Sequence, residues 1–499
     1  MMGIKSVQET MLYNFSLSKR VPEDHLLRKV DQVIDLSFVR ALVTDKYSHT
    51  GQPSIDPEVI FRMMLIGYLY GITSERRLAD DISLNMAYMW FIGYNLDEST
   101  PNHSVLSKAR SRYGKEVFEQ FFKRVLEQCI KTGLVKGDKV YMDSTYIYAN
   151  ASRKSITPRP DAIEPALTSK EYVEKVFAEN PVEEEKSKES KEQKPPDNVN
   201  KTESTESKEP EKTKNRKLSN QTHCSKTDPE SSIISHKDHI ISVELAYKEH
   251  FTVDEHKRVI TAVKVTPGAI GDEALLSTLI KEQPCPVKEV CADSKYGTAE
   301  NFKYLQSQGI QPTIPPWLGC GVQIPGRIGK HEFVYDSKTD TYTCPSGKKL
   351  SLGKNPKSYP IFTKYLSHKE DCQKCTLSNR CLSPDKRFKR NSKTLYRHMD
   401  DIYKEQAAER LLTEDGKRTM SNRKLYAEWV NAESKTKHGM RRAMFRGLAQ
   451  TTIQVLMTAS VQNLKRLMSQ ISTPTTIFKE LYTNFYYFTS DTIKTLAFA

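Results

Sequence analysis

Two aspartates follow apolar segments at widely separated places in the chain. Asp143 comes directly after "KVYM" and before "STYIYANASR", and Asp293 comes directly after "EVCA" in "VKEVCADSKYG". Each pattern predicts a short strand that ends at the acid, where an aspartate most often caps a turn. Two aspartates at the ends of neighbouring strands would repel each other unless cations neutralise them, and hard divalent ions prefer carboxylate oxygens. The pair therefore indicates a metal site.

A third carboxylate could come from the helical segment "KLYAEWVNAESK", which holds Glu428 and Glu433. Lys435 is seven residues after Glu428, two helical turns on, so both project from one helix face. Lys435 could hold a phosphate beside a metal bound by Glu428. Glu433 points to the other side, which makes it a control position. A solvated helix face with ordinary charges is the alternative.

Four cysteines form a second group with the spacing of metal ligands. Cys372 and Cys375 form a CxxC pair, Cys381 follows, and Cys344 lies upstream in "YTCPSG". Four reduced thiols fit a structural tetrahedral Zn²⁺ site, and the spacing favours zinc over incidental cysteines. The other cysteines suggest no site: Cys129, Cys224, Cys285, Cys291 and Cys320.

The segments that hold the two aspartates are predicted to form a mixed sheet with helices on its faces. Apolar runs at about 243–253 and 258–266 flank "DEHK", which indicates a hairpin. "VKEVCADSKYGTAENFKYLQSQGIQPTIPP" indicates strand, acid, helix, strand. Within these segments His250 is expected to hydrogen-bond inside a strand, and Asp254 to sit in the hairpin turn. His438, next to Gly439, is expected to mark a helix break.

The rest of the chain divides by composition. Residues 1 to about 135 are predicted to be helical: "PEVIFRMMLIGYLYGI" is apolar at nearly every position, and Ser74 is a predicted N-cap. The polar run at 181–221 has almost nothing to bury and is expected to be a mobile linker. Residues 317 to about 400 are turn-rich, and a helical pattern returns from about 401 to 468.

The charge balance favours a polyanionic partner. Lys and Arg number 76 against 62 Asp and Glu, which gives a net charge of +14 and a pI near 9.1. Nucleic acid is the foremost candidate, although lysine-rich solubility gives the same balance. No apolar run is long enough to span a membrane, and the N-terminus lacks the apolar core of a signal peptide. We therefore expect a cytoplasmic, nucleoid-associated protein with reduced cysteines.

Taken together, these motifs resemble the DDE-type transposases of bacterial insertion sequences. "YMDSTYIYANASR" is similar to the first-acid strand of that family, "VCADSKYGTAENFKYLQSQGIQPTIPP" to its second-acid strand, and "AEWVNAESKTKHGMRRAMFRGLAQTTIQVLMTASVQNLKRL" to its third-acid helix. "STPNHSVLSKARSR" resembles the helical domain that precedes the catalytic one. The resemblance covers most of the chain. It implies an α/β fold: an RNase H-like mixed sheet with flanking helices, after an all-helical N-terminal domain and interrupted by a cysteine-containing insertion.

The resemblance also implies a domain order. A helical DNA-binding domain would occupy 1–135, the first part of the catalytic core 136–316, and the insertion 317–400. The third-acid helix and a basic helix would follow at 401–470, with a C-terminal tail at 471–499.

By position, the resemblance makes Asp143, Asp293 and Glu428 the metal-binding catalytic acids, which are expected to converge with Lys435 beside them. In part of the family a tyrosine and an arginine precede the glutamate. Here Ser421 and Lys424 occupy those positions, so the guanidinium fork is expected to be lost. The implied DNA contacts are the basic residues Lys108, Arg110, Arg112, Lys424, Arg441, Arg442 and Arg446. Helical packing or dimerisation is the alternative role for the N-terminal helices.

The implied activity is transposition. The protein would bind the terminal inverted repeats of an insertion sequence, cleave the DNA and join the 3′ ends to target DNA, as a homodimer or a higher synaptic complex. Two Mg²⁺ or Mn²⁺ ions about 3.5–4 Å apart would assist both phosphoryl transfers. The alternatives are a catalytically inactive DNA-binding relative and an RNase H-like nuclease without strand transfer.

Overall fold

The structure is a computed structural model that describes residues 16–48, 50, 54–160, 166–179, 218–235, 243–317, 326–353, 362–382 and 392–471. The predicted linker lies outside these residues except for 218–221, and so does the predicted tail after 471. The chain divides into two units, each considered by itself below. The first comprises Met1–Lys136, Ser144–Leu275 and Trp429–Ala499, and the second comprises Gly137–Asp143 and Leu276–Glu428.

The N-terminal part of the first unit is helical, as predicted. Helix α4 is buried along most of its length, with Pro57 at its first position and the Asp56 side chain accepting a hydrogen bond from the Glu58 amide. Ser74 caps α5 by accepting from the Arg77 amide at 3.3 Å. The elements in order are α1 (Leu17–Arg20), α2 (Leu26–Val33), α3 (Ser37–Val43), η1 (Thr44–Lys46), α4 (Pro57–Tyr70), α5 (Glu75–Leu84), α6 (Met86–Ile92) and α7 (Ser104–Lys131).

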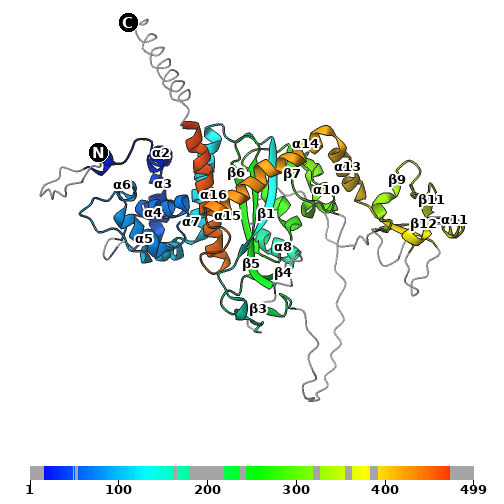
Figure 1. Cartoon of the computed structure of the whole chain (residues 1–499), viewed down its shortest axis with the longest axis horizontal. Helices are drawn as coiled ribbons and strands as arrows, with labels where there is room; N and C mark the ends of the chain where they lie inside the picture. The colour runs from blue at the N-terminus through cyan, green and yellow to red at the C-terminus, as the bar shows by residue number, and fades with distance from the viewer. Residues whose placement is uncertain are drawn as a thin grey trace, which may run out of the picture. The chain divides into compact units, whose positions relative to one another are not determined.

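Helix α16 (Leu448–Ile471) is the central element of the first unit. Its side chains from Thr451 to Asn463 are buried, apart from the half-buried Thr452, and a helix buried on all sides needs packing partners around it. It packs against α2, α4 and α7 and also against β6 (Ile260–Pro267) (Figure 1). Asn463 accepts from the Ile260 amide and donates to the Ile260 carbonyl, both at 2.8 Å. The N-terminal helices and the strands of this unit therefore share one core.

In the first unit β5 (Val243–Asp254) pairs antiparallel with β4 (Ser232–Ser235) through its first residues and with β6 through the rest. This confirms the predicted hairpin. Residues 144–148 of β1 (Lys139–Tyr148) lie beside β5. The smaller elements are η2 (Arg153–Ser155), β2 (Ile156–Pro158), α8 (Ser169–Glu179), β3 (His223–Ser225), η3 (Asp272–Leu275) and α15 (Trp429–Lys437).

The second unit contains three parallel strands. Residues 139–141 of β1 pair with β7 (Glu289–Cys291), which pairs with β8 (Gln311–Thr313). This confirms the predicted order of strand, acid, helix and strand. Parallel and antiparallel pairing together with covering helices make the fold mixed α/β, as predicted. The helical elements are α9 (Leu276–Lys281), η4 (Ser294–Tyr296), α10 (Ala299–Ser307), α13 (Asp401–Leu412), α14 (Glu414–Arg423) and a π-helical turn, η7 (Lys424–Glu428).

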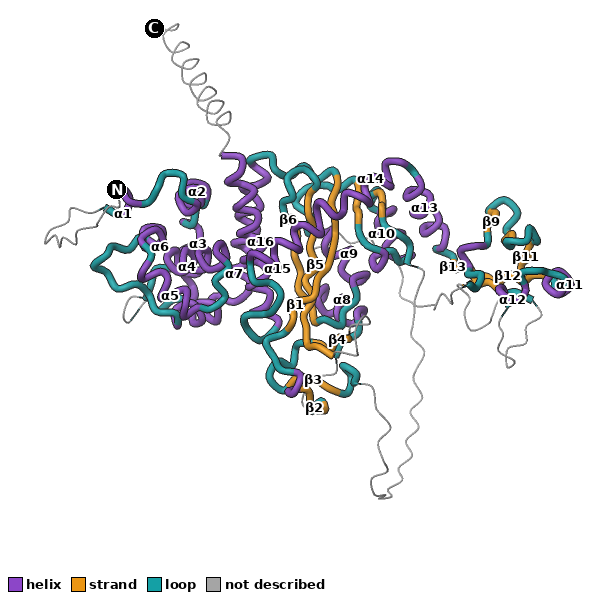
Figure 2. Tube along the Cα trace, in the orientation of Figure 1, coloured by secondary structure: helices purple, strands orange, loops and turns teal. Residues whose placement is uncertain are grey.

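Residues 326–398 hold a five-stranded antiparallel sheet that the sequence did not predict (Figure 2). Its order is β13-β12-β11-β10-β9, and its strands are only three to six residues long, too short for a clear alternating pattern. The elements are η5 (Lys330–Glu332), β9 (Val334–Asp336), β10 (Thr341–Thr343), β11 (Lys349–Leu352), β12 (Phe362–Ser367), α11 (Lys369–Gln373), α12 (Ser378–Cys381) and β13 (Thr394–His398).

Among the residues that the structure describes, no helix is both long and apolar enough to cross a membrane.

Candidate active site

Asp143 lies on β1, and Asp293 lies two residues past the end of the neighbouring parallel strand β7. The register pairs Lys139 with Glu289 and Tyr141 with Cys291, so two residues further on Asp143 is level with Asp293. Asp293 keeps an extended backbone, with φ −78 and ψ 172. Because side chains alternate along extended chain, the two carboxylates belong to the same face as Tyr141 and Cys291.

Asp143 does not end its strand, and that expectation was wrong. It is the fifth residue of the ten-residue strand β1, which runs on to Tyr148. The sequence after the acid, "STYIY", has β-branched and aromatic residues that suit a strand, and those residues lie beside β5. Asp143 is therefore held by regular strand backbone on both sides. Asp293, in contrast, caps η4 by accepting from the Lys295 amide at 3.0 Å.

Arg423 neutralises Asp143. Its Nη2 donates to Asp143 Oδ1 at 2.7 Å, and the two side chains are only 18% and 10% exposed. Burial lowers the pKa of Arg423, but the nearby Asp143 and Asp293 carboxylates outweigh it and raise the pKa above its ordinary value. The two acids therefore already share a buried positive charge.

Arg423 also corrects the expectation that the guanidinium is lost. In an α-helix the residue one turn before Glu428 is Lys424, which is exposed. Residues 424–428 form a π-helical turn instead, which closes over five residues and so takes up one residue more. The residue one turn before Glu428 is then Arg423. The sequence could not distinguish the two residues, because Arg423 and Lys424 are adjacent, basic and of similar helix propensity. Only the wider π-helical turn shows that Arg423 is the one that pairs with Asp143.

Helix α14 and η7 cover the face that bears the aspartates. Tyr426 stacks on Tyr141 with ring centroids 4.6 Å apart and planes at 11°. The Cys291 thiol lies 3.6 Å from the Met420 sulfur. Tyr141 and Cys291 share their face with the acids, so α14 and η7 pass directly over this face.

Glu428 itself is exposed at the end of η7. Within the described ranges, no three Asp, Glu, His or Cys side chains are close enough together to hold a metal ion. The structure thus sets Asp143 and Asp293 level with each other but does not gather Glu428 with them into a closed site. Lys435 is half-buried in α15, which belongs to the other unit.

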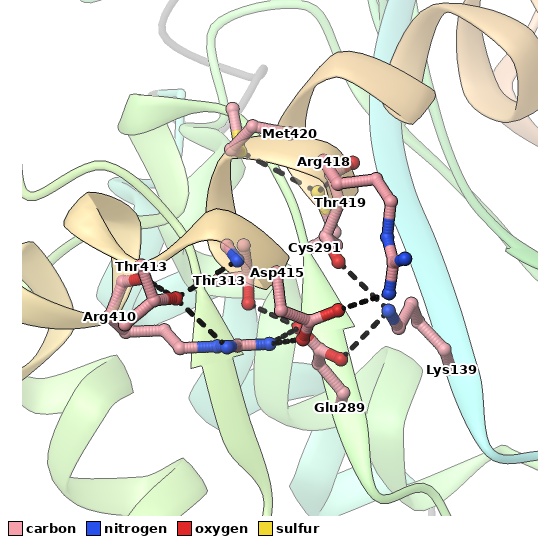
Figure 3. A network of polar contacts seen from close by, with 11 residues as sticks. Lys139, Glu289, Cys291, Thr313, Arg410, Thr413, Asp415, Arg418, Thr419 and Met420 are labelled. Atoms are coloured by element: carbon pink, nitrogen blue, oxygen red, sulfur yellow. Dashed lines mark hydrogen bonds and ion pairs between the residues drawn. The ribbon is translucent and has the colours of Figure 1, made fainter.

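A polar network anchors the opposite ends of the same strands (Figure 3). Glu289 is its centre: it pairs with Lys139 Nζ at 3.0 Å, accepts from Arg410 Nη2 at 3.0 Å and accepts from the Thr313 hydroxyl. Burial raises the pKa of Glu289, but these hydrogen bonds outweigh it and hold the pKa below its ordinary value. The sequence offered no sign of this cluster, because its members come from three strands and a helix.

The network continues into the helix that bears Arg423. Lys139 Nζ donates to the Thr419 hydroxyl of α14 at 2.8 Å. Hydrogen bonds from Arg410 and Arg418 hold the pKa of Asp415, in the first turn of α14, at about 2. These contacts fix α14 against β1 and β7, and they thereby position Arg423 over Asp143.

Glu433 is not a solvated helix residue. Its carboxylate pairs with Arg466 and with Lys465 at 3.4 Å, and it lies 3.7 Å from His438 Nε2. Burial raises the pKa of Glu433, but His438, Arg466 and Lys465 outweigh it and lower the pKa to about 2. Glu433 is thus a structural residue that fastens α15 to α16, which makes it a poor choice as a neutral control.

His438 has a structural role as well. Helix α15 ends at Lys437 and Gly439 has a φ of +68, so the predicted helix break is confirmed. The His438 side chain is fully buried, and its Nδ1 lies 2.7 Å from the Tyr68 carbonyl. His250 and Asp254 also behave as predicted. His250 Nε2 bonds the Thr266 hydroxyl at 3.0 Å, and Asp254 accepts from the turn amide of His256 at 2.8 Å.

Arg110 is a packing residue, in contrast to the expected DNA contact. It is 5% exposed, pairs with Glu75 and lies 3.8 Å from the ring centroid of Phe445. Its partners lie 35 and 335 positions away in the sequence, so local pattern could not reveal its burial. Its neighbours Lys108 and Arg112 are exposed.

The remaining predicted basic contacts lie beside the end of β1. Arg441 and Ala443 extend the strand edge through backbone bonds to Tyr148 at 3.1 and 2.8 Å. Arg442 donates to the Ala149 carbonyl at 2.9 Å and Arg446 to the Asn150 carbonyl at 3.2 Å. All three arginines are exposed, so they form a basic edge on the first unit. Residues 440–447 form a turn, a bridge at Arg442 and a bend, where a basic helix was expected after the break.

Comparison with known proteins gives the class of protein. Residues 15–112 match a family model described as a transposase domain, DUF772, and residues 343–468 match one described as a transposase DDE domain. Both matched regions, residues 15–112 and 343–468, therefore relate the chain to transposases. More particularly, it belongs to the DDE-type transposases of insertion sequences. The second match includes Arg423 and Glu428, whereas Asp143 and Asp293 lie between the two matches.

One solved structure also matches, the cryo-EM structure of a piggyBac transposase synaptic complex with hairpin DNA. The match covers 90% of this chain and 80% of that one, at 8% identity and a TM-score of 0.27, so it carries no argument about the fold. Comparison with curated proteins gives no match.

Proposed function

We propose that this chain is an active transposase that cuts at the ends of its insertion sequence and joins the 3′ ends to target DNA. The observation that carries the proposal is that Asp143 on β1 and Asp293, two residues past β7, are level with each other beneath α14, which supplies Arg423, and η7, whose last residue is Glu428. The DDE domain match supports an RNase H-like arrangement of this core.

The donor set fits divalent cations. Two carboxylates on one face need positive charge, and in this structure a buried guanidinium already provides part of it. Asp143 and Asp293, joined by Glu428, would hold Mg²⁺ or Mn²⁺ through oxygen ligands. Two such ions would activate water or a DNA 3′-hydroxyl as the nucleophile and stabilise charge on the leaving oxygen.

The protein's own residues would orient these acids and the DNA. Strand β1 fixes Asp143 on both sides, and the Glu289 network fixes α14 above it. Arg423 pairs with Asp143, and its fork of donors could transfer from the carboxylate to phosphate oxygens when DNA enters. Glu428, exposed at the end of the π-helical turn, would close the site only with the substrate present.

Exposed basic side chains would supply most of the DNA affinity. Lys108, Arg112, Lys424 and the basic edge of Arg441, Arg442 and Arg446 are suited to phosphate contacts, which carry no sequence information. Their contribution should fall with rising salt, because releasing counterions into a more concentrated solution gains less free energy. Joining two transposon ends in one complex would require at least two copies of the chain, which supports a homodimer or a higher synaptic complex.

The test uses the purified protein with its flanking DNA and Mg²⁺. Asp143→Asn, Asp293→Asn and Glu428→Gln should each abolish cleavage and joining while DNA binding persists. Glu409→Gln is the matched control, because Glu409 is an exposed helical glutamate of the same unit. Full cleavage by Asp143→Asn would refute the assignment.

The same assay separates the rival activities. Cleavage without joining of pre-cleaved ends would indicate a nuclease. Specific binding without cleavage by the wild-type protein would indicate an inactive relative.

A further inference from the structure

Four thiols line one small cavity in the second unit. Cys344 comes from the turn between β10 and β11, Cys372 from α11, Cys375 from the link between α11 and α12, and Cys381 from the end of α12. The cavity measures about 40 Å³, and Lys348 and Lys393 line it as well. All four cysteines are free thiols. Among the residues that the structure describes, these sulfurs are not close enough together to hold a metal ion, so binding an ion would require them to move closer.

The sulfurs already receive hydrogen bonds of the kind that support thiolate ligands. The Lys348 amide donates to Cys344 Sγ at 3.3 Å, across a turn whose Gly347 has a φ of +76. The Leu377 amide donates to Cys375 Sγ at 3.4 Å. The Ser346 hydroxyl lies 3.1 Å from Cys375 Sγ, and that of Ser367 lies 2.9 Å from Cys372 Sγ. Such outer partners fix the orientation of metal ligands.

The elements that present these thiols have little else to hold them. Helices α11 and α12 are five and four residues long and bury no residue. Isolated helices of this length are not stable in water. The five-stranded sheet beside them has a core of six buried residues: Ile328, Phe333, Tyr342, Leu350, Tyr365 and Leu395. A core this small normally needs a disulfide or a metal as a staple.

Two lysines at the cavity wall suit the charge of a metal bound by thiolates. The four sulfurs line one cavity although they come from a turn, two short helices and the link between those helices. Four thiolates around a divalent ion carry a net charge of minus two. Lys348 and Lys393 at the cavity wall would offset that charge.

We propose that Cys344, Cys372, Cys375 and Cys381 bind one structural Zn²⁺, which ties the β10–β11 turn to α11 and α12. Four thiolate ligands select Zn²⁺ over the hard ions of a carboxylate site, because sulfur is a soft donor. The expected geometry is tetrahedral with Zn–S distances of about 2.3 Å. The ion would hold the five-stranded sheet and its two short helices together and would take no part in DNA chemistry.

The first experiment measures zinc in the full-length protein, purified in reductant without chelator. About one zinc per chain is expected. Cys375→Ser should lose most of it, and Cys285→Ser should keep it, because Cys285 belongs to the same unit but does not line the cavity. Equal loss in both variants, or a Cys372–Cys375 disulfide in metal-free wild-type protein, would overturn the proposal.

A second measurement serves if Cys375→Ser does not fold. Wild-type protein stripped of metal should bind about one Co²⁺ and give the visible absorption of a tetrahedral thiolate complex. Trypsin should cut within 326–398 after stripping and not after Zn²⁺ is restored. Failure to bind Co²⁺ would refute the site. Neither readout involves DNA cleavage, so the outcome is independent of the proposed transposase activity.

Discussion

The second unit contains two groups of metal-ligand residues that differ in how complete they are. The four thiols line one cavity and receive hydrogen bonds from amides and hydroxyls. Of the three acids, Asp143 on β1 is level with Asp293 just past β7, Asp143 pairs with Arg423, and Glu428 is exposed apart from them. Thiols gather without an ion because they are neutral when protonated, whereas ionised carboxylates repel one another. The difference is of the kind expected between a structural site whose ligands all come from the protein and a catalytic site that keeps an open position.

The comparison predicts opposite responses to metal withdrawal, and this is the largest effect expected. Structural zinc in small domains is worth on the order of 10 kcal/mol, so its removal should unfold the five-stranded sheet. Withdrawal of Mg²⁺ should leave thermal unfolding unchanged, because Arg423 already neutralises Asp143. Calorimetry of protein stripped of each metal in turn measures both. Equal destabilisation by Mg²⁺ withdrawal would contradict the view that the acidic site is open.

Glu428→Gln should separate chemistry from stability. The side chain is exposed, so its charge is not needed for packing. Cleavage should fall at least about 100-fold, the effect of removing one preorganised electrostatic group, with an unchanged unfolding midpoint. A gel-based assay measures the cleavage rate, and a thermal melt of the same sample measures the unfolding midpoint. A lower midpoint with cleavage intact would place Glu428 among the structural residues.

Glu433→Gln, five residues later, should have the reverse effect. It leaves Arg466 and Lys465 without their buried anion, which should cost on the order of 3 kcal/mol of unfolding free energy. Cleavage should persist where the variant is folded.

The effect of Glu433 should depend on pH. Its folded pKa is about 2 against an ordinary 4.5, so its stabilising contribution is complete above pH 4.5 and is lost as pH falls towards 2. Chemical denaturation at several pH values should show the difference between wild type and variant shrinking over that window. A difference that is constant with pH would refute the ion-pair explanation.

Arg423 and Asp143 should be energetically coupled. Removing either leaves the other charge buried, so Arg423→Ala and Asp143→Asn should each destabilise the protein, and the double variant should do so by less than their sum. A coupling energy of about 1–3 kcal/mol is expected for groups in direct contact. Lys424→Ala is the control, since Lys424 is exposed and one position away. Strict additivity would break the assignment of Arg423 as the partner of Asp143.

Features set by local sequence could be predicted, and those set by distant partners could not. The two strand-acid segments, the hairpin and the cap at Ser74 follow from alternation and turn chemistry within a few residues. The pairing of Asp143 with Arg423 depends on a π-helical turn, and the local sequence is equally compatible with a regular α-helix. Glu289, Arg110 and Glu433 owe their burial to partners tens to hundreds of positions away. The sequence therefore indicated the acids but not the basic residues that position and neutralise them.

The smallest expected effects are those of single basic residues on DNA affinity, and they test whether binding is separate from both metal groups. Lys108→Ala and Arg112→Ala each remove one exposed charge, so each should lower the slope of log affinity against log salt by about one phosphate contact. Arg110→Ala, between them on the same helix, should leave that slope unchanged and lower stability instead, because Arg110 is packed on Phe445. Fluorescence anisotropy at several salt concentrations, with a melt for each variant, distinguishes the two. A reduced slope in Arg110→Ala alone would return that residue to the DNA surface. It would also mean that Arg110 leaves its packed position against Phe445 when DNA binds, a movement that neither proposed metal site requires.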